Sequence, residues 1–237
     1  MSRRGLREAR RYLLGVLVLE GAAAVAGLRL RGRAALAALP ALLFFFRDPE
    51  RELWPEDDAV YAAADGVVTA VEPVDDPWMG GGDAIRVTIF LSLHNVHVTR
   101  SPVAGRITDE EELPGGFRPA FLRRAEENRR RRLAIDGPRG RVVVAQVAGM
   151  VARKISPWVG LGDELGSGRR LALIHFGSRI DVVLPADEVR VLVEPGRRVR
   201  AGVTVLGRYT GVPRRATDEA ATSAAESERA TAAAPVQ

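Results

Sequence analysis

Hydrophobic and polar residues alternate in short runs from about residue 60 to residue 209, and Gly, Pro and Asp turns separate these runs. Within residues 84–91 every second residue is apolar and lies on one face, as in a half-buried strand. These residues are Ile85, Val87, Ile89 and Leu91. Further strands are predicted over residues 142–151, 171–176, 180–184 and 189–193. Short strands with frequent turns predict a mainly antiparallel β domain.

A helix is predicted to interrupt the strands over residues 119–133. It contains four consecutive arginines, Arg129 to Arg132, which we interpret as a solvated face, with a phosphate-binding patch as the alternative. No aromatic residues are interleaved with these arginines, which argues against a nucleic-acid surface.

The turns of the β region are spaced by glycine in a way that is typical of barrel-sandwich hybrids, the fold of the biotinyl and lipoyl carriers. Those carriers need a lysine at a hairpin tip, and Lys154, the sole lysine, lies in neither carrier motif. The predicted fold class is therefore mainly β (α+β), a barrel-sandwich-hybrid-like antiparallel β domain with an N-terminal apolar helical anchor.

The anchor is predicted from two apolar runs that follow a basic N-terminus. The first run covers residues 12–28 and contains Glu20, and the second covers residues 34–46 and contains Pro40. A helix that spans a bilayer needs about 20 apolar residues. We therefore expect a tight membrane hairpin or helices that dip into one leaflet, and a helix pair buried in a soluble protein is the alternative.

These patterns divide the chain into three parts. Residues 1–46 form the basic N-terminus and the membrane-associated segments, and residues 47–210 form the β domain. Residues 211–237 are rich in Ala, Thr, Glu and Ser without hydrophobic periodicity, so this tail is predicted to be disordered.

The composition of the 237 residues narrows the chemistry. The absence of Cys excludes disulfides, thiol nucleophiles and cysteine metal ligands. Three His leave little room for a histidine zinc site, so no metal site is predicted. A net charge of +5 favours an anionic partner, either nucleic acid or an acidic membrane surface.

Three places carry residues that are able to do chemistry. Asp65 precedes a glycine, which by itself is an ordinary turn signal. His94 and His97 stand beside a predicted strand, where an extended backbone would point them to opposite faces. Ser178 follows Gly177 inside an apolar run, a position that a β-bulge would also explain.

An Asp, a His and a Ser can together form an activated hydroxyl nucleophile. Because Gly177 offers an unhindered carbonyl, a base-activated Ser178 can attack it in an N-to-O acyl shift. β-Elimination of the resulting ester cuts the chain and leaves dehydroalanine, which hydrolyses to a pyruvoyl group. A serine hydrolase that uses the same three residues without cleavage is an alternative.

With these residues the sequence resembles the phosphatidylserine decarboxylases, in particular the short bacterial and archaeal type, from about residue 45 to residue 209. The resemblance rests on several segments in the same order and spacing. They are Phe-Arg-Asp-Pro-Glu-Arg at 46–51, Ala-Asp-Gly around Asp65, Asn-Val-His-Val at 95–98, Asn128, residues 144–149 and 152–153, and Phe-Gly-Ser-Arg-Ile-Asp-Val at 176–182.

The resemblance implies a proenzyme that cleaves itself between Gly177 and Ser178, with His97 as the base and Asp65 orienting that base. Ser178 then becomes the pyruvoyl group of the chain 178–237, which stays associated with the chain 1–177. This covalent cofactor forms a Schiff base with phosphatidylserine and takes up the electrons left by carbon dioxide, and phosphatidylethanolamine is released.

Two further residues have roles implied by the resemblance or by their charge. His94 is implied as the proton donor in decarboxylation. Arg179 is predicted to hold the phosphate or carboxylate of the substrate, with a structural salt bridge as the alternative.

The expected partner is phosphatidylserine in the membrane, with no nucleic acid, and a homodimer is left open. Basic segments favour the anionic cytoplasmic face of the cell membrane. The alternatives are a non-catalytic, membrane-tethered β-hybrid adaptor, and archaetidylserine as the true substrate.

Overall fold

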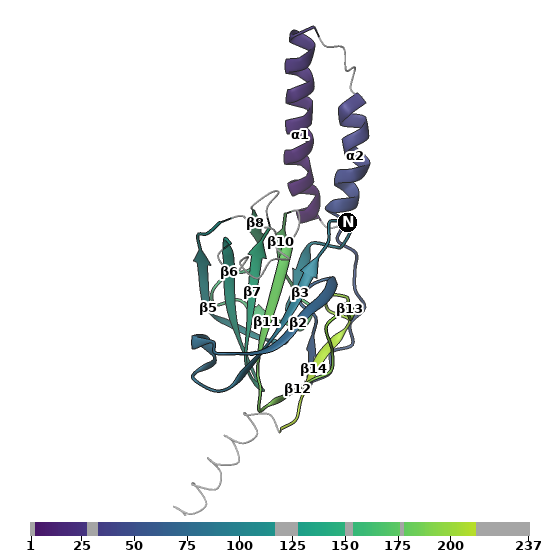
Figure 1. The fold of residues 1–237 in the computed structure, drawn as a ribbon. Coiled ribbons are helices and arrows are strands. Elements are labelled where there is room, and N and C mark those ends of the chain that lie inside the picture. Colours follow the sequence, from purple (N-terminus) through teal and green to yellow (C-terminus); the bar gives the residue numbers. More distant parts are fainter. Residues whose placement is uncertain (1–2, 28–32, 117–127, 150–153, 176–177, 212–237) are drawn as a thin grey trace, which may run out of the picture.

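The computed structural model describes residues 3–27, 33–116, 128–149, 154–175 and 178–211. Within these residues the named strands form three sheets, and all of their pairings are antiparallel. The predicted mainly antiparallel β domain is thereby confirmed. Figure 1 shows two helices that project from one end of this β region.

The largest sheet has eight strands in the order β13-β2-β3-β11-β7-β6-β5-β9. In chain order these are β2 (Gly66–Val74), β3 (Ala84–Leu91), β5 (Gly105–Leu113), β6 (Arg130–Gly137), β7 (Gly140–Ala148), β9 (Glu164–Leu165), β11 (Ser178–Pro185) and β13 (Arg198–Val199). Strand β11 therefore lies inside the sheet and pairs with β3 on one side and β7 on the other.

Two sheets of three strands complete the β region. One has the order β4-β10-β8, with β4 (Val98–Arg100), β10 (Arg170–Ile174) and β8 (Ile155–Pro157). The other has the order β1-β14-β12, with β1 (Ala59–Tyr61), β14 (Val205–Tyr209) and β12 (Val189–Val191). A 3-10 turn, η1 (Pro77–Met79), stands between β2 and β3.

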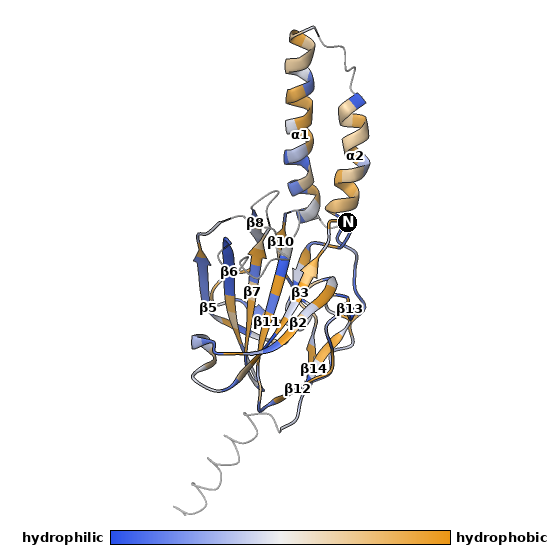
Figure 2. Ribbon diagram, in the orientation of Figure 1, coloured by the Kyte–Doolittle hydropathy of each residue, from blue (hydrophilic) through white to orange (hydrophobic). Residues whose placement is uncertain are grey.

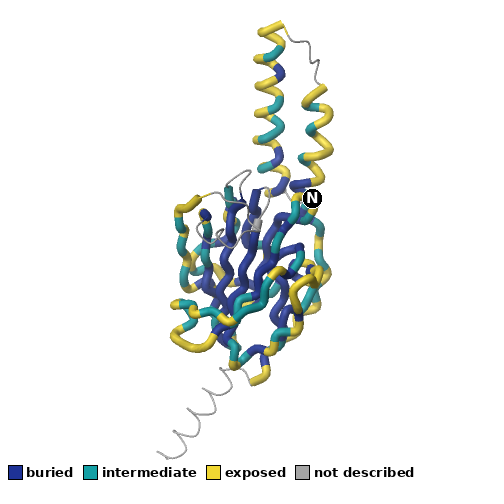
Figure 3. The backbone as a smooth tube through the Cα atoms, in the orientation of Figure 1, coloured by how far each residue is buried: buried dark blue, intermediate teal, exposed yellow. Residues whose placement is uncertain are grey.

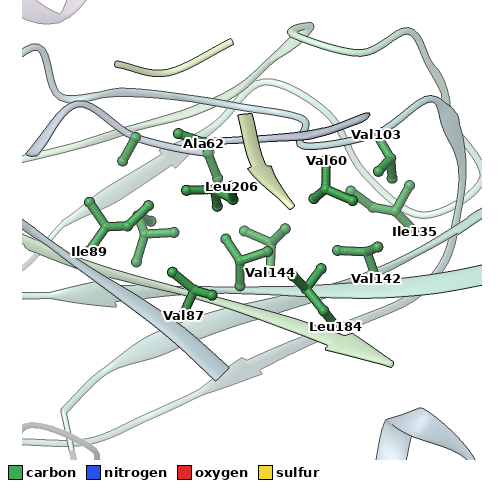
Figure 4. Packing of buried hydrophobic residues seen from close by; sticks show 14 of the residues in the cluster. Val60, Ala62, Val87, Ile89, Val103, Ile135, Val142, Val144, Leu184 and Leu206 are labelled. Carbon is green, nitrogen blue, oxygen red and sulfur yellow. The ribbon is translucent and has the colours of Figure 1, made fainter. Parts of the chain in front are cut away.

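The largest of three apolar clusters in the described residues lies between the sheets, and Figure 4 draws part of it. Val60 of β1, Val144 of β7 and Leu206 of β14 are fully buried in it, so strands distant in sequence share one core. Figure 3 shows the same result as a buried interior within an exposed rim. This burial supplies most of the free energy that holds the three sheets together.

Gly66 explains why a glycine follows Asp65. A Cβ at this position would lie 2.2 Å from the backbone oxygen of Phe90 on β3. Only glycine allows β2 to approach β3 so closely at its first residue.

The predicted helix over residues 119–133 is wrong where the structure tests it, and the rest of the prediction, 119–127, lies outside the described residues. Residues 130–133 belong to strand β6. The arginine run is also not a uniformly solvated face, because Arg131 is 1% exposed. Its Nε donates to Glu110 Oε1 at 2.8 Å, since both side chains share one face of the β5–β6 pair.

The two helices are α1 (Arg3–Val25) and α2 (Arg33–Phe45), which pack against each other as a hairpin. Glu20 links them, because its carboxylate accepts the N–H of Ala34 at 2.8 Å. The first N–H groups of a helix have no partner within that helix, so this carboxylate caps α2. In the described part of the chain, no helix has the length and apolarity needed to cross a membrane.

The predicted apolar anchor is only partly reproduced. Figure 2 shows hydrophobic residues along most of α2, whereas α1 takes in the basic N-terminus and is mixed in character. Large apolar side chains on both helices are nevertheless exposed: Val18 and Leu19 are each 70% exposed and Leu36 is 74% exposed. Within this chain the helix pair is therefore not buried, contrary to what the alternative of a buried pair expects.

Replacing Arg131 by Ala should lower the free energy of unfolding by about 3 kcal/mol, because Glu110 loses its buried partner. Arg129 provides the matched control. Its partner Glu112 and its own side chain are about half exposed, so Arg129→Ala should change stability by no more than about 0.5 kcal/mol. Urea unfolding of both variants measures the difference, and equal losses would contradict the burial of Arg131.

Candidate active site

The chain crosses from one sheet to another at the predicted cleavage point. Strand β10 of the three-stranded β4-β10-β8 sheet ends at Ile174, and strand β11 of the eight-stranded sheet begins at Ser178. The backbone of Ser178 pairs with Leu91 of β3 and Ala148 of β7. Gly177 lies outside the described residues. The predicted scissile bond thus lies between two strands, β10 and β11, each of which is held by backbone hydrogen bonds within its own sheet.

The residues on both sides of this connection are tied to neighbouring strands. The N–H of Ile174 donates to the backbone oxygen of His97 at 3.0 Å, and the N–H of His175 donates to that of Lys154 at 2.9 Å. Beside Ser178, the buried Asn128 donates from Nδ2 to the backbone oxygen of Ala148 at 3.0 Å. The bond from Ile174 holds His97 next to the strand that leads into the predicted cleavage point.

His97 is fully buried, and its tautomer is set by the backbone. Its Nδ1 lies 2.9 Å from the backbone oxygen of Asn95, and a carbonyl oxygen only accepts, so Nδ1 carries the hydrogen. Nε2 then holds a lone pair. A turn between Ser92 and Asn95 positions this carbonyl, because each residue's N–H bonds an oxygen of the other at 2.9 Å.

The surroundings of His97 keep the imidazole uncharged. Burial lowers the pKa of His97 to about 4, with the charge of Arg47 acting in the same direction and the Asn95 hydrogen bond opposing it. The ring of Phe45, at the end of α2, lies with its centroid 4.4 Å from that of His97. A neutral ring that carries a lone pair on Nε2 is the form of histidine that accepts a proton.

His175 is a second buried, uncharged histidine, and it connects the site to α1. The hydroxyl of Tyr12 lies 2.8 Å from Nδ1, and that of Ser156 lies 3.0 Å from Nε2. Burial lowers the pKa of His175 to about 4, and the charge of Lys154 adds to the effect. No local sequence pattern points to Tyr12, because its contact with His175 spans 163 residues.

Asp65 lies at the start of β2, and its carboxylate is held by groups other than His97. Oδ2 accepts from Arg51 at 2.8 Å, and Oδ1 accepts the N–H of Ala201 at 2.8 Å. In the described part of the chain no hydrogen bond joins Asp65 to His97. The orienting contact that the resemblance implies for Asp65 is made here by the carbonyl of Asn95.

His94 and Arg179 lie in different surroundings. His94 is exposed in the turn between β3 and β4, so the backbone from His94 to His97 is not extended, and Arg47 donates to its carbonyl. Arg179 is buried, and its Nε donates to Asp181 at 2.7 Å. This ion pair is the structural alternative for Arg179, and its contact with substrate stays a prediction.

Gln146 was not assigned a role from the sequence, yet it leaves a polar atom without a partner beside the site. It is fully buried and pairs with Ile180, two residues from Ser178 on the same face of β11. Its Nε2 donates to Thr99 Oγ1, whose own hydrogen goes to the carbonyl of Ala172. Among the described residues, no group bonds Oε1 of Gln146. A buried acceptor of this kind is costly unless something donates to it.

Comparison with known proteins identifies the protein family whose sequences are similar to this chain. Residues 41–207 match the family described as phosphatidylserine decarboxylase. The phosphatidylserine decarboxylase proenzyme of Symbiobacterium thermophilum is 49% identical over 170 residues, 70% of this chain and 78% of the relative. That of Streptomyces griseus is 42% identical over 215 residues, 87% of this chain and 96% of the relative. The resemblance drawn from the motifs is confirmed.

The two buried histidines predict a loss of stability in weak acid. Between pH 6.5 and 4 these histidines bind a proton in the unfolded chain but not in the folded chain. The free energy of unfolding therefore falls as pH falls. From pH 6.5 to 5 each histidine should contribute between about 1 and 2 kcal/mol of this loss. Urea unfolding of the Ser178→Ala chain at both pH values measures it.

Two variants identify the source of the effect. His97→Asn should remove about half of the pH-dependent loss, and His94→Gln should leave it unchanged because His94 is exposed. A loss that is the same in all three chains would show that carboxylates, and not the buried histidines, are responsible.

Proposed function

The chain belongs to the phosphatidylserine decarboxylase family, and from that premise we propose that it is made as a precursor, cuts itself between Gly177 and Ser178, and then decarboxylates phosphatidylserine to phosphatidylethanolamine. The observation that carries the proposal is His97, a buried and neutral base whose backbone is bonded to the strand entering the cleavage point. The division into an anchor (1–46) and a catalytic domain (47–210) is part of the proposal.

Self-cleavage uses only groups of the chain itself. His97 Nε2 takes the hydroxyl proton of Ser178, and Oγ attacks the carbonyl carbon of Gly177. The C–N bond breaks, the freed nitrogen is protonated, and an ester joins the two residues. Removal of the Cα proton of Ser178 expels the Gly177 carboxylate. Water then displaces ammonia from the dehydroalanine and leaves the pyruvoyl group.

The fixed tautomer of His97 gives the first proton transfer a defined acceptor atom. Nδ1 keeps its hydrogen because the Asn95 carbonyl accepts it, so the proton from Ser178 has one destination on the ring. The depressed pKa means that nearly all molecules hold His97 in its basic form at neutral pH. The same low pKa makes the imidazolium a strong acid, which suits its return of the proton to the departing nitrogen.

The two products should remain one particle after cleavage. Strand β11 would belong to the chain 178–237, but both of its neighbours, β3 and β7, belong to residues 1–177. Strands β13 and β14 likewise pair with β2 and β1. Cutting one peptide bond leaves all these ladders and the common core intact.

The residues around the first position of β11 suit a pyruvoyl group. Such a group supplies an electrophilic carbonyl that binds the serine amine and withdraws electrons as carbon dioxide leaves. The unpartnered Oε1 of Gln146 is an acceptor suited to the N–H of that amine. His94, exposed in the turn before His97, is suited to deliver a proton from solvent.

We assign the helical hairpin to the lipid surface. Exposed apolar residues extend along α1 from Leu14 to Val25, a length of about 17 Å at 1.5 Å per residue. The hydrocarbon core of a bilayer is about 30 Å thick, so the hairpin reaches roughly through one leaflet. This favours helices that dip into the membrane, at its anionic cytoplasmic face, over helices that cross it.

The intact masses of the purified protein test self-cleavage directly. We expect two chains, the smaller lighter than residues 178–237 by one ammonia, because the serine nitrogen is lost. Ser178→Ala should stay full length and inactive, since it has no nucleophile. His97→Ala should also stay uncut.

Each contrary mass has a definite meaning. A single uncut chain that decarboxylates phosphatidylserine would refute the pyruvoyl mechanism. A single uncut chain without activity would favour the non-catalytic adaptor. Normal cleavage of His97→Ala would show that another group is the base. Assays with archaetidylserine beside phosphatidylserine decide the lipid backbone of the substrate.

Two further variants separate cleavage from decarboxylation. Asp65→Asn should slow cleavage by about tenfold without abolishing it, because the Asp65 carboxylate is held by Arg51 and Ala201 and does not bond His97 directly. His94→Gln should be cut at the normal rate and should lower kcat of the mature enzyme. Time courses of cleavage and of carbon dioxide release measure these effects. An unchanged cleavage rate in Asp65→Asn, or an uncut His94→Gln, would overturn the corresponding assignment.

A further inference from the structure

An open groove of about 520 Å³ lies where the start of α1 meets the chain after β8. Three arginines at helical spacing on α1, namely Arg4, Arg7 and Arg11, line one wall. Trp158 lines the facing wall, and the ring of Trp158 lies 5.8 Å from the guanidinium of Arg4. The groove therefore combines several cations with a rigid aromatic edge.

The carboxylates in the groove are already engaged. Glu8 Oε2 accepts from Lys154 at 3.0 Å and lies 3.7 Å from Arg11. Asp163 Oδ2 accepts the N–H of Gly160 at 3.0 Å. In contrast, the exposed guanidinium of Arg7 has no hydrogen-bond or ion-pair partner among the residues that the structure describes. The groove thus holds an excess of positive charge with an unused, planar donor.

The groove adjoins the candidate active site. Glu8, which lines it, lies with Oε2 3.8 Å from Nε2 of His175, and His175 is three residues before Ser178. The groove also lies at the end of α1 nearest the β region, before the exposed apolar stretch that begins at Leu14. When that stretch enters a leaflet, the three arginines stand at the depth of the lipid headgroups.

We propose that this groove binds the phosphodiester of the serine phospholipid, with Arg7 as the main contact and Arg4 and Arg11 beside it. The proposal rests on the proposed decarboxylase function and adds a binding site to it. A guanidinium offers parallel N–H donors that match two oxygens of a phosphodiester. In a serine phospholipid this group stands between the serine, which must reach the active site, and the glycerol, which stays with the membrane.

The test compares two arginines of the same helix. Arg7→Gln and Arg10→Gln remove the same charge from α1, but Arg10, which is also exposed, does not line the groove. With a short-chain, soluble phosphatidylserine, Arg7→Gln should raise KM about tenfold and leave kcat nearly unchanged, because the contact is made equally before and during the reaction. Arg10→Gln should change neither value, and Arg7→Lys should restore part of the loss.

A binding measurement keeps this test independent of catalysis. The uncut Ser178→Ala precursor is titrated by calorimetry with the same soluble lipid and, separately, with inorganic phosphate. We expect the lipid to bind more tightly than phosphate, and Arg7→Gln but not Arg10→Gln to weaken lipid binding about tenfold.

Three outcomes would overturn the proposal. Equal losses in the two glutamine variants would indicate general attraction between charges, and no loss in either would remove the groove from substrate binding. Equal affinity for inorganic phosphate and lipid would make the groove a site for free anions. If the wild-type chain neither cleaves nor decarboxylates, the proposed function fails, and the calorimetric comparison still decides whether the groove binds the headgroup.

Discussion

The hydrogen bond from His97 Nδ1 to the carbonyl of Asn95, made at a fully buried ring, is the contact on which the proposed chemistry depends. It fixes the tautomer, and burial keeps the ring uncharged, so the base is ready without a carboxylate in contact. The backbone hydrogen bonds between strands determine where the two site residues lie. They hold His97 against the end of β10 and hold Ser178 at the first position of β11.

The helical hairpin belongs to the same unit as the active site. Phe45 of α2 lies against His97, and Tyr12 of α1 bonds His175, whose ring also contacts Phe46. These contacts exclude water from both histidines, which is the cause of their low pKa values. The segment that we assign to lipid binding therefore also keeps the proposed base uncharged, so the proposed anchor and the proposed catalytic site share residues.

The β domain could be predicted from local pattern, because alternation and turn residues act over a few positions. Residues 84–91 form strand β3 with the predicted bounds, and its buried face carries Val87, Ile89 and Leu91. The arginine run misled the prediction for a physical reason. Four like charges indicate a solvated face when seen alone, but Arg131 finds Glu110 on a neighbouring strand and is buried.

The candidate site was predictable to the extent that it rests on motifs. Gly177, Ser178 and His97 were proposed from residue type and order, whereas Tyr12 and Gln146 required the fold, since their contacts join distant segments. Asp65 shows the limit of a transferred role, because its carboxylate bonds Arg51 and Ala201 in this chain. A motif gives the identity of a group, and only the packing shows which partner it has.

The pH dependence of self-cleavage tests the central claim most directly. A chain from a brief cell-free synthesis is diluted into buffers from pH 4 to pH 8, and the fraction cut is followed by mass. If the fold keeps His97 neutral, the rate should be flat from pH 8 to about 5.5 and should fall by half near pH 4, because the base is lost only when the imidazole is protonated. A rate that falls by half near pH 6.5, the value of an exposed histidine, would contradict the account.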